Sequence, residues 1–207
     1  MNARDLMNEA PVIPVIVVND VSTAVPLAEA LVAGGLPVLE VTLRTPVAME
    51  AMKAMQSVKG AIVGVGTAIN GNDLKAAKDA GAKFAVSPGF TEELGSTSND
   101  IGLPLLPGIA NSADIMRAHS LGFKELKFFP ASQAGGPAML KALGGPFVDA
   151  VFCPTGGVSL SNANDYLSLP NVLCVGGSWV APSDKIAAGD WAAVEAVAKE
   201  AANLPRG

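Results

Sequence analysis

The stretch Lys124-Glu125-Leu126-Lys127-Phe128-Phe129-Pro130-Ala131 is short, rich in aromatic residues and closed by a proline, which predicts a β-strand. Side chains two residues apart share one face of a strand, so Leu126 and Phe128 point one way and Lys127 points the other. In a sheet that helices cover, the apolar pair faces the helices and Lys127 faces the interior. A solvated lysine at a sheet edge and a buried ion pair with Glu125 are the two structural alternatives.

Seven other strand-like segments occur along the chain, and a stretch with helical spacing of apolar residues follows each strand. The predicted strands span residues 11–18, 37–43, 61–65, 83–87, 104–106, 124–131, 149–153 and 172–175. The predicted helices span residues 3–10, 21–33, 46–58, 71–80, 91–98, 111–120, 137–143, 159–167 and 182–202, with a break at Gly189. Strict alternation with continuously apolar strands is typical of a parallel sheet covered by helices.

Eight strand–helix units predict an α/β fold of the (β/α)₈ TIM barrel type, with a short N-terminal helix and a single domain over residues 1–207. The alternative is an open doubly wound sheet. Such a sheet favours a glycine-rich turn after the first strand, and residues 18–21 contain no glycine.

Composition excludes several classes of protein. Half of the 207 residues are hydrophobic and 16% are charged, with 22 glycines and 15 prolines, which indicates a folded chain with many tight turns. The net charge is −5 and the positive residues are scattered, so a basic patch for nucleic acid is not expected. No apolar run has the length of a membrane span, and the N-terminus lacks the apolar core of a signal peptide. We therefore expect neither a nucleic-acid nor a membrane partner.

The cysteines and the histidine argue against a metal site. Cys153 and Cys174 lie in apolar, strand-like segments, so we expect reduced thiols in the core and a cytoplasmic location. One histidine and two separated cysteines give no metal-binding cluster, and His119 is predicted to be a surface or packing residue. Any chemistry is then carried by a lysine, a carboxylate or a bound phosphate.

Polar residues are concentrated where strands end, which is where barrel enzymes of this type build their active sites. In the strand over 37–43, apolar residues alternate with Glu40 and Thr42, which turns these two side chains towards the interior. Arg44 follows at the rim and is able to bind a carboxylate bidentately. A carboxylate inside a barrel needs a cationic partner or a catalytic role, so a structural ion pair is the alternative for Glu40.

Glycines follow the third, seventh and eighth predicted strands, at Gly64-Val65-Gly66, Gly156-Gly157 and Gly176-Gly177. After the third strand, the glycines would allow a ligand close to the backbone. The two later pairs match the phosphate site of many barrels, in which backbone N–H groups and a helix N-terminus bind the dianion. A tight turn is the alternative for either pair alone.

An interior lysine next to such a phosphate site suggests imine chemistry. A neutral amine adds to a ketone, and the imine then withdraws electrons. A lysine of ordinary pKa, about 10.4, is neutral in only about four molecules in ten thousand at pH 7. Burial beside Phe129 and the charge of Arg44 favour the neutral amine of Lys127, whereas Glu40 opposes it and is better placed as a proton carrier. The expected ligand has a carboxylate, an adjacent ketone and a more distant phosphate.

Six motifs carry a family resemblance: Glu40-Val41-Thr42-Leu43-Arg44-Thr45, Val63-Gly64-Val65-Gly66-Thr67, Ser87-Pro88-Gly89, Lys127-Phe128-Phe129-Pro130-Ala131, Phe152-Cys153-Pro154-Thr155-Gly156-Gly157 and Gly176-Gly177-Ser178-Trp179. In this order they resemble the 2-keto-3-deoxy-6-phosphogluconate (KDPG) / 4-hydroxy-2-oxoglutarate (KHG) aldolases, from Pro14 into the last helix. The resemblance implies a (β/α)₈ class I aldolase of the Entner–Doudoroff pathway that assembles as a homotrimer and needs no metal or other cofactor. It implies cleavage of KDPG to pyruvate and glyceraldehyde 3-phosphate, and of KHG to pyruvate and glyoxylate.

The resemblance also implies roles for single residues. It assigns the Schiff-base lysine to Lys127, the general acid/base to Glu40, and carboxylate contacts to Arg44 and Thr67, with Thr155 near the keto acid. The residues implied to shape the pocket are Pro88 and Phe129, and those implied to bind phosphate are Gly156, Gly157, Gly177 and Ser178.

One loop departs from the family, and two rival functions stay open. Family members often carry an acidic residue after Pro130-Ala131, where this chain has Ser132-Gln133-Ala134, and we assign this loop no role.

A phosphosugar decarboxylase or epimerase would use the same phosphate loops, but no Asp-x-Lys run lies at a strand end. A phosphosugar sensor without catalysis would not need Lys127.

Overall fold

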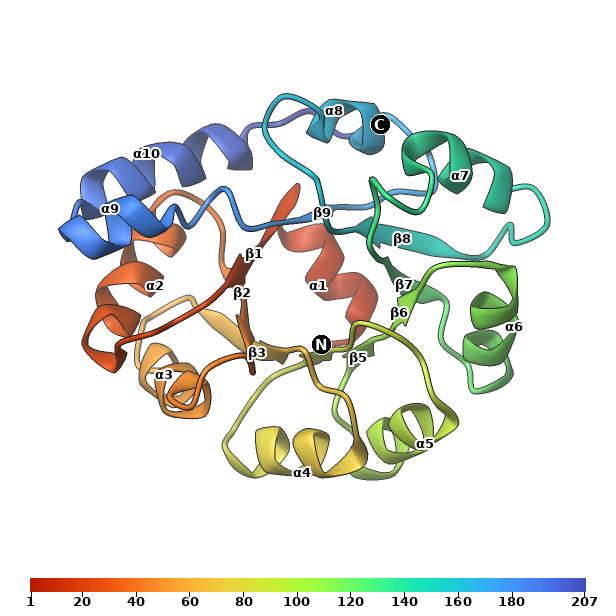
Figure 1. The fold of residues 1–207 in the computed structure, drawn as a ribbon, viewed down its shortest axis with the longest axis horizontal. Coiled ribbons are helices and arrows are strands. Elements are labelled where there is room, and N and C mark those ends of the chain that lie inside the picture. The colour runs from red at the N-terminus through yellow and green to blue at the C-terminus, as the bar shows by residue number, and fades with distance from the viewer.

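Parallel strands curl around the short helix α1, and the other helices surround the strands (Figure 1). The computed structural model describes residues 1–207. The strands are β1 (Val12–Ile16), β2 (Val38–Thr42), β3 (Ile62–Gly66), β4 (Ala85–Val86), β5 (Leu105–Leu106), β6 (Gly108–Ile109), β7 (Glu125–Phe128), β8 (Val151–Pro154) and β9 (Val175–Gly177). The helices are α1 (Ala3–Glu9), η1 (Val21–Thr23, a 3₁₀ turn), α2 (Ala24–Ala33), α3 (Ala48–Met55), α4 (Gly71–Asp79), α5 (Glu92–Ile101), α6 (Ser112–Ser120), α7 (Gly136–Leu143), α8 (Ala163–Leu167), α9 (Ser183–Ala188) and α10 (Trp191–Ala202). None of them combines the length and apolarity that crossing a membrane requires.

The strands pair in the order of the chain. A six-stranded sheet has the order β5-β4-β3-β2-β1-β9, and a three-stranded sheet has the order β6-β7-β8. β5 and β6 are separated only by Pro107, which has no N–H group for a ladder hydrogen bond. Parallel bridges from Phe152 to Val172 and from Thr155 to Gly176 connect β8 with the segment that forms β9. A parallel α/β fold is thereby confirmed. The doubly wound alternative is wrong, because β1 lies between the first and last neighbours in sequence, β2 and β9.

Several predicted boundaries differ from the structure by one to four residues, and two of these differences lie next to the glycine pairs. The last strand is β9 at Val175–Gly177, and residue 172 contributes only an isolated bridge. The helix predicted over 159–167 begins at Ala163, because the side chain of Asn162 closes the preceding turn. Its Oδ1 accepts from the Ser159 N–H group at 2.8 Å, and its Nδ2 donates to the Gly157 carbonyl at 2.9 Å.

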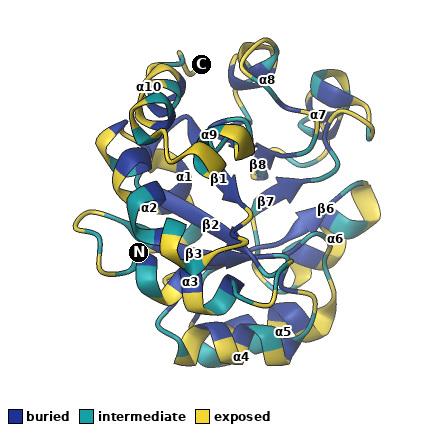
Figure 2. Cartoon of the chain, turned by 60° about the vertical axis from the view of Figure 1, so that its left-hand side comes forward, coloured by how far each residue is buried: buried dark blue, intermediate teal, exposed yellow.

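Side chains of the strands alternate between two apolar clusters. The larger cluster, of 46 buried residues, includes Leu126 and Phe128 and lies between the strands and the outer helices. The smaller one, of nine buried residues, contains Leu6, Met7, Ile13, Val38, Phe84, Val86, Leu106, Cys153 and Cys174. It therefore joins α1 to the inner faces of the strands. Figure 2 shows the burial that results, with buried strands at the centre and exposed residues on the outer sides of the helices.

Helix α1 covers the end at which the strands of the two curled sheets, here called the ring, begin. Asn2 caps the helix through a reciprocal pair of hydrogen bonds with Asp5. Arg4 donates to Glu125 at 2.8 Å, at the start of β7. Glu125 is thus engaged by α1, and an ion pair between Glu125 and Lys127, one of the two structural alternatives, is wrong.

We predict that Met7→Ala lowers the free energy of unfolding by about 2–5 kcal/mol, because Met7 is fully buried between α1 and the strands. Urea unfolding measures the change. Met116→Ala on α6 is the matched control, since Met116 is 64% exposed and its truncation should change stability by at most about 0.5 kcal/mol. Equal effects of the two substitutions would contradict the packing of α1 inside the ring.

Candidate active site

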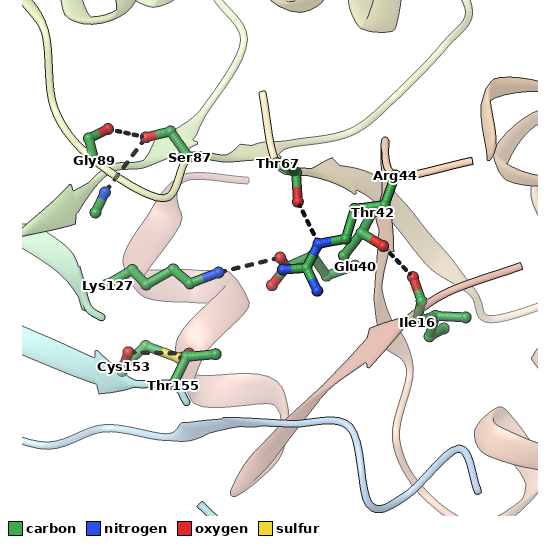
Figure 3. A network of polar contacts seen from close by, with 11 residues as sticks. Ile16, Glu40, Thr42, Arg44, Thr67, Ser87, Gly89, Lys127, Cys153 and Thr155 are labelled. Carbon is green, nitrogen blue, oxygen red and sulfur yellow. Dashed lines mark hydrogen bonds and ion pairs between the residues drawn. The ribbon is translucent and has the colours of Figure 1, made fainter. Parts of the chain in front are cut away.

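An amine and a carboxylate meet inside the ring, near the ends of their strands (Figure 3). Lys127 Nζ on β7 lies 3.3 Å from Glu40 Oε1 on β2, and the two side chains are 4% and 3% exposed. β2 belongs to the six-stranded sheet and β7 to the three-stranded one, so the pair links the two sheets across the interior. The interior position of Lys127 follows from the alternation in its strand.

The amine of Lys127 lies beside an aromatic ring, and not all of its hydrogen-bond donors have an acceptor in the chain. The ring of Phe129 is centred 5.4 Å from Lys127 Nζ. An ammonium group has three N–H donors, and the chain supplies one acceptor, Glu40. Removing two charges from water is costly unless they pair well. The arrangement therefore leaves the amine with unused donors and a proton acceptor at hydrogen-bonding distance.

Two glycines make room for the polar side chains. A Cβ atom on Gly66 would overlap the carboxylate of Glu40, and one on Gly176 would overlap the side chain of Thr155. We expected the glycines of β3 to bring a ligand close to the backbone. At Gly66 this expectation is wrong, because the space beside the backbone is filled by Glu40.

Arg44 and Thr67 form a second polar pair at the mouth of the site. Arg44 Nε donates to Thr67 Oγ1 at 3.1 Å, and the terminal nitrogens of this exposed guanidinium have no partner in the chain. Thr67 has a φ of 60°, which is strained for a β-branched residue. The pair thus presents a planar fork of donors of the kind that binds a carboxylate.

Pro88 and Thr155 follow β4 and β8, which belong to different sheets. Thr155 is buried, and its hydroxyl has two long contacts, 3.4 Å to the Cys153 carbonyl and 3.9 Å to Cys153 Sγ, which leave it available to a ligand. Pro88 is held by Ser87, whose buried hydroxyl donates to the Gly89 carbonyl at 2.7 Å and accepts from the Gly108 N–H group at 3.3 Å. We had assigned Ser87 no role, and the only signal for it was its place before a strand-closing proline.

The turns after β8 and β9 present free backbone donors. Gly156 and Gly157 have φ angles of 97° and 73°, in the left-handed region that glycine tolerates. Their N–H groups, and that of Ser178, donate to no group of the chain. The bridge from Thr155 to Gly176 places the two turns side by side. Successive free N–H groups of this kind form a site for an anion.

The contribution of helix N-termini to this anion site stays a prediction. α8 begins at Ala163 and α9 at Ser183, several residues after the glycine pairs. At Gly177, the indole of Trp179 lies over the position of a Cβ atom, so packing alone already requires glycine there.

A cavity of about 730 Å³ extends the site from the end of β1 towards α9. Val15 and Ser178 line it, and Val15 lies opposite Glu40 in the register of β1 and β2. Of the polar groups described above, only Ser178 lines this cavity, so the cavity adjoins the turn after β9 and does not contain Lys127 or Glu40.

The sequence and the structure both match known proteins. The family model described as "KDPG and KHG aldolase" matches residues 3–197. The chain belongs to the KDPG and KHG aldolase family. This confirms the resemblance found in the six motifs.

Several relatives in this family are similar over nearly their whole length. A 2-dehydro-3-deoxy-phosphogluconate aldolase of Pseudoalteromonas atlantica is 50% identical over 97% of this chain and 94% of its own. The KDPG aldolase of Zymomonas mobilis ZM4, crystallised with 3-phosphoglycerate, has a TM-score of 0.96 and 50% identity and covers 99% of this chain and 97% of its own. The KDPG aldolase of Legionella pneumophila, with pyruvate captured as a covalent carbinolamine, has a TM-score of 0.95 and 43% identity, with coverages of 98% and 99%.

We assign no role in the reaction to the histidine or to the two cysteines, of which Cys153 adjoins the site with its Sγ 3.9 Å from Thr155 Oγ1. His119 packs edge-on against Phe147, with ring centroids 5.8 Å apart. Cys153 and Cys174 are free, buried thiols of the inner cluster, and burial raises the pKa of Cys174 well above its usual range. No group of three or more His, Cys, Asp or Glu side chains is arranged to hold a metal ion.

We predict that Thr67→Gly leaves the free energy of unfolding unchanged or raises it by up to about 1 kcal/mol, because it relieves a strained φ angle. Thr42→Gly is the control, since Thr42 is buried, has no positive φ angle and donates to the Ile16 carbonyl at 2.9 Å. It should lose about 2 kcal/mol or more in urea unfolding. Similar losses at both positions would show that Thr67 is not strained.

Proposed function

We propose that the chain is a class I aldolase that cleaves KDPG to pyruvate and glyceraldehyde 3-phosphate, and KHG to pyruvate and glyoxylate. The observation that carries this proposal is the buried amine of Lys127, held 3.3 Å from the carboxylate of Glu40 at the active end of the ring. The covalent carbinolamine of the Legionella pneumophila relative supports it, because that species forms when an amine adds to the ketone of pyruvate.

In the first half of the reaction, Lys127 forms an imine with the substrate. Glu40 accepts a proton from the amine, which then adds to the C2 carbonyl carbon to give a carbinolamine. Glu40 then returns its proton to the C2 hydroxyl group, which leaves as water, and the carbinolamine becomes a protonated imine. The chemistry uses the electron-withdrawing imine of the protein's own lysine, so the proposal includes no separate cofactor.

In the second half, the carbon–carbon bond breaks. Glu40, directly or through a water molecule, removes the proton of the C4 hydroxyl, the C3–C4 bond breaks, and its electrons move onto the imine nitrogen to give an enamine. Glyceraldehyde 3-phosphate leaves. Glu40 returns this proton to C3 of the enamine, and addition of water to the resulting imine releases pyruvate and restores the amine.

The other polar groups fit the two ends of the substrate. We assign the keto-acid carboxylate to Arg44 and Thr67, with Thr155 beside it, and the walls of the pocket to Pro88 and Phe129. We assign the phosphate to the turns of Gly156, Gly157, Gly177 and Ser178, where the N–H groups of Gly156, Gly157 and Ser178 are free. The complex of the Zymomonas mobilis relative with 3-phosphoglycerate supports a site for a phosphorylated acid in this fold.

We also propose that the two sheets form one closed (β/α)₈ barrel and a single domain over residues 1–207. Two observations support this proposal: only Pro107 separates β5 from β6, and isolated bridges connect β8 with the segment that forms β9. The homotrimer and the cytoplasmic location remain predictions from the resemblance and from the thiols, and light scattering of the purified protein measures the first.

We predict that the wild-type chain releases pyruvate from KDPG in an assay coupled to lactate dehydrogenase, and that Lys127→Met lowers kcat by about 1000-fold or more, because methionine keeps the length but not the nucleophile. Pyruvate release by Lys127→Met at the wild-type rate would overturn the role of Lys127. Binding of KDPG by the wild type without any release would instead identify a sensor.

We predict that Gly66→Ala lowers kcat by about 100-fold or more, since the added methyl group displaces the Glu40 carboxylate that moves the protons. Gly145→Ala is the matched control, because a Cβ atom there makes only ordinary contact, and it should retain the wild-type kcat. An active Gly66→Ala variant would show that the position of Glu40 is not critical.

A further inference from the structure

The segment after β7 continues to pair with the segment after β8. The N–H group of Ala131 donates to the Thr155 carbonyl at 2.8 Å, and the N–H group of Ser132 donates to the Gly156 carbonyl at 3.0 Å. These two bonds lie beyond the last registered pair of the strands, Phe128 and Pro154. The chain at residues 131–132 is therefore fastened directly to the turn that presents free N–H groups.

The side chain of Ser132 lies between that turn and α8. Its Oγ is 3.2 Å from the hydroxyl of Tyr166, which is 2% exposed and has no other hydrogen bond. A Cβ atom on Gly157 would overlap the Ser132 side chain, so this side chain lies directly against Gly157. Ser132 therefore connects a buried hydroxyl of α8 to the outer side of the glycine pair.

Both carbonyls of the glycine pair are occupied. Gly156 O accepts from the Ser132 N–H group at 3.0 Å, and Gly157 O accepts from Asn162 Nδ2 at 2.9 Å. A carbonyl oxygen that faced the site would repel an anion, whereas an N–H group attracts it. Engaging the carbonyls leaves the N–H groups of this turn as its free hydrogen-bonding groups.

We propose that Ser132 is a positioning residue for the phosphate of the substrate. Through its backbone N–H group and the hydroxyl pair with Tyr166, it holds the turn of Gly156 and Gly157 with the N–H groups available to the dianion. The inference rests on the proposed aldolase function and deepens it, because it gives the Ser132-Gln133-Ala134 loop a role in recognising phosphorylated substrates.

The test compares Ser132→Ala and Tyr166→Phe with the wild type. Each variant removes one hydroxyl of the pair and, as expected for the loss of one hydrogen bond, should raise the KM for KDPG and the inhibition constant of inorganic phosphate about 3- to 10-fold. The kcat should stay within about 2-fold, since the lost contact is made equally in the ground and transition states. Deuterium exchange of the pyruvate methyl group, which needs Lys127 and Glu40 but no phosphate, should be unchanged.

Two further variants sharpen the test. The double variant should be no worse than either single one, because the two hydroxyls act as a pair. Ser120→Ala on α6 is the control, since the exposed Ser120 hydroxyl bonds only to the Arg117 carbonyl, and it should match the wild type.

The outcomes separate this inference from the proposed function. If the wild type does not cleave KDPG, the aldolase proposal fails. If it does, unchanged phosphate constants in both Ser132→Ala and Tyr166→Phe overturn the role of Ser132. A parallel loss of pyruvate exchange overturns it as well, because the effect then reaches Lys127. Tyr166→Phe keeps the buried ring, so it provides the answer even where Ser132→Ala folds poorly.

Discussion

The ion pair between Lys127 and Glu40 is the constraint on which the interior of this protein depends. An isolated charge in such a place is expensive, and an amine and a carboxylate are tolerated there only as partners. Because the two residues come from β2 and β7, the pair also spans the inside of the ring from one sheet to the other. Any change that separates the two strands, or fills the space beside them, acts on the reactive groups directly.

The ring divides into an apolar layer and a polar layer. At the end where the strands begin, Leu6 and Met7 of α1 pack among the inner residues and exclude water from that end of the interior. At the other end, the free N–H groups of two turns and the fork of Arg44 face the solvent side. A keto acid phosphate offers a carboxylate, a ketone and a dianion, the three kinds of group that we propose bind to Arg44, to Lys127 and to these N–H groups.

Sequence patterns predicted the elements and the inward face of the strands well, because these depend on local periodicity. Alternation within residues 124–131 placed Lys127 inside, but it did not choose between Glu40 and Glu125 as its partner. That choice depends on Arg4, which engages Glu125 from the far end of the chain. The prediction that a ligand fills the space beside Gly66 was likewise wrong. Glu40 fills that space, and it comes from the neighbouring strand, which the pattern within β3 does not reveal. The positions of Ser87 and Ser132 depend on hydrogen bonds that produce no periodic pattern in the sequence.

The central claim is that the dry amine of Lys127 forms the covalent bond to the substrate. Reduction with sodium borohydride in the presence of pyruvate, followed by mass spectrometry of peptides, tests it most directly. The account predicts a three-carbon unit attached to Lys127 and to no other lysine. A label on another lysine, or no label in a preparation that releases pyruvate from KDPG, would contradict it.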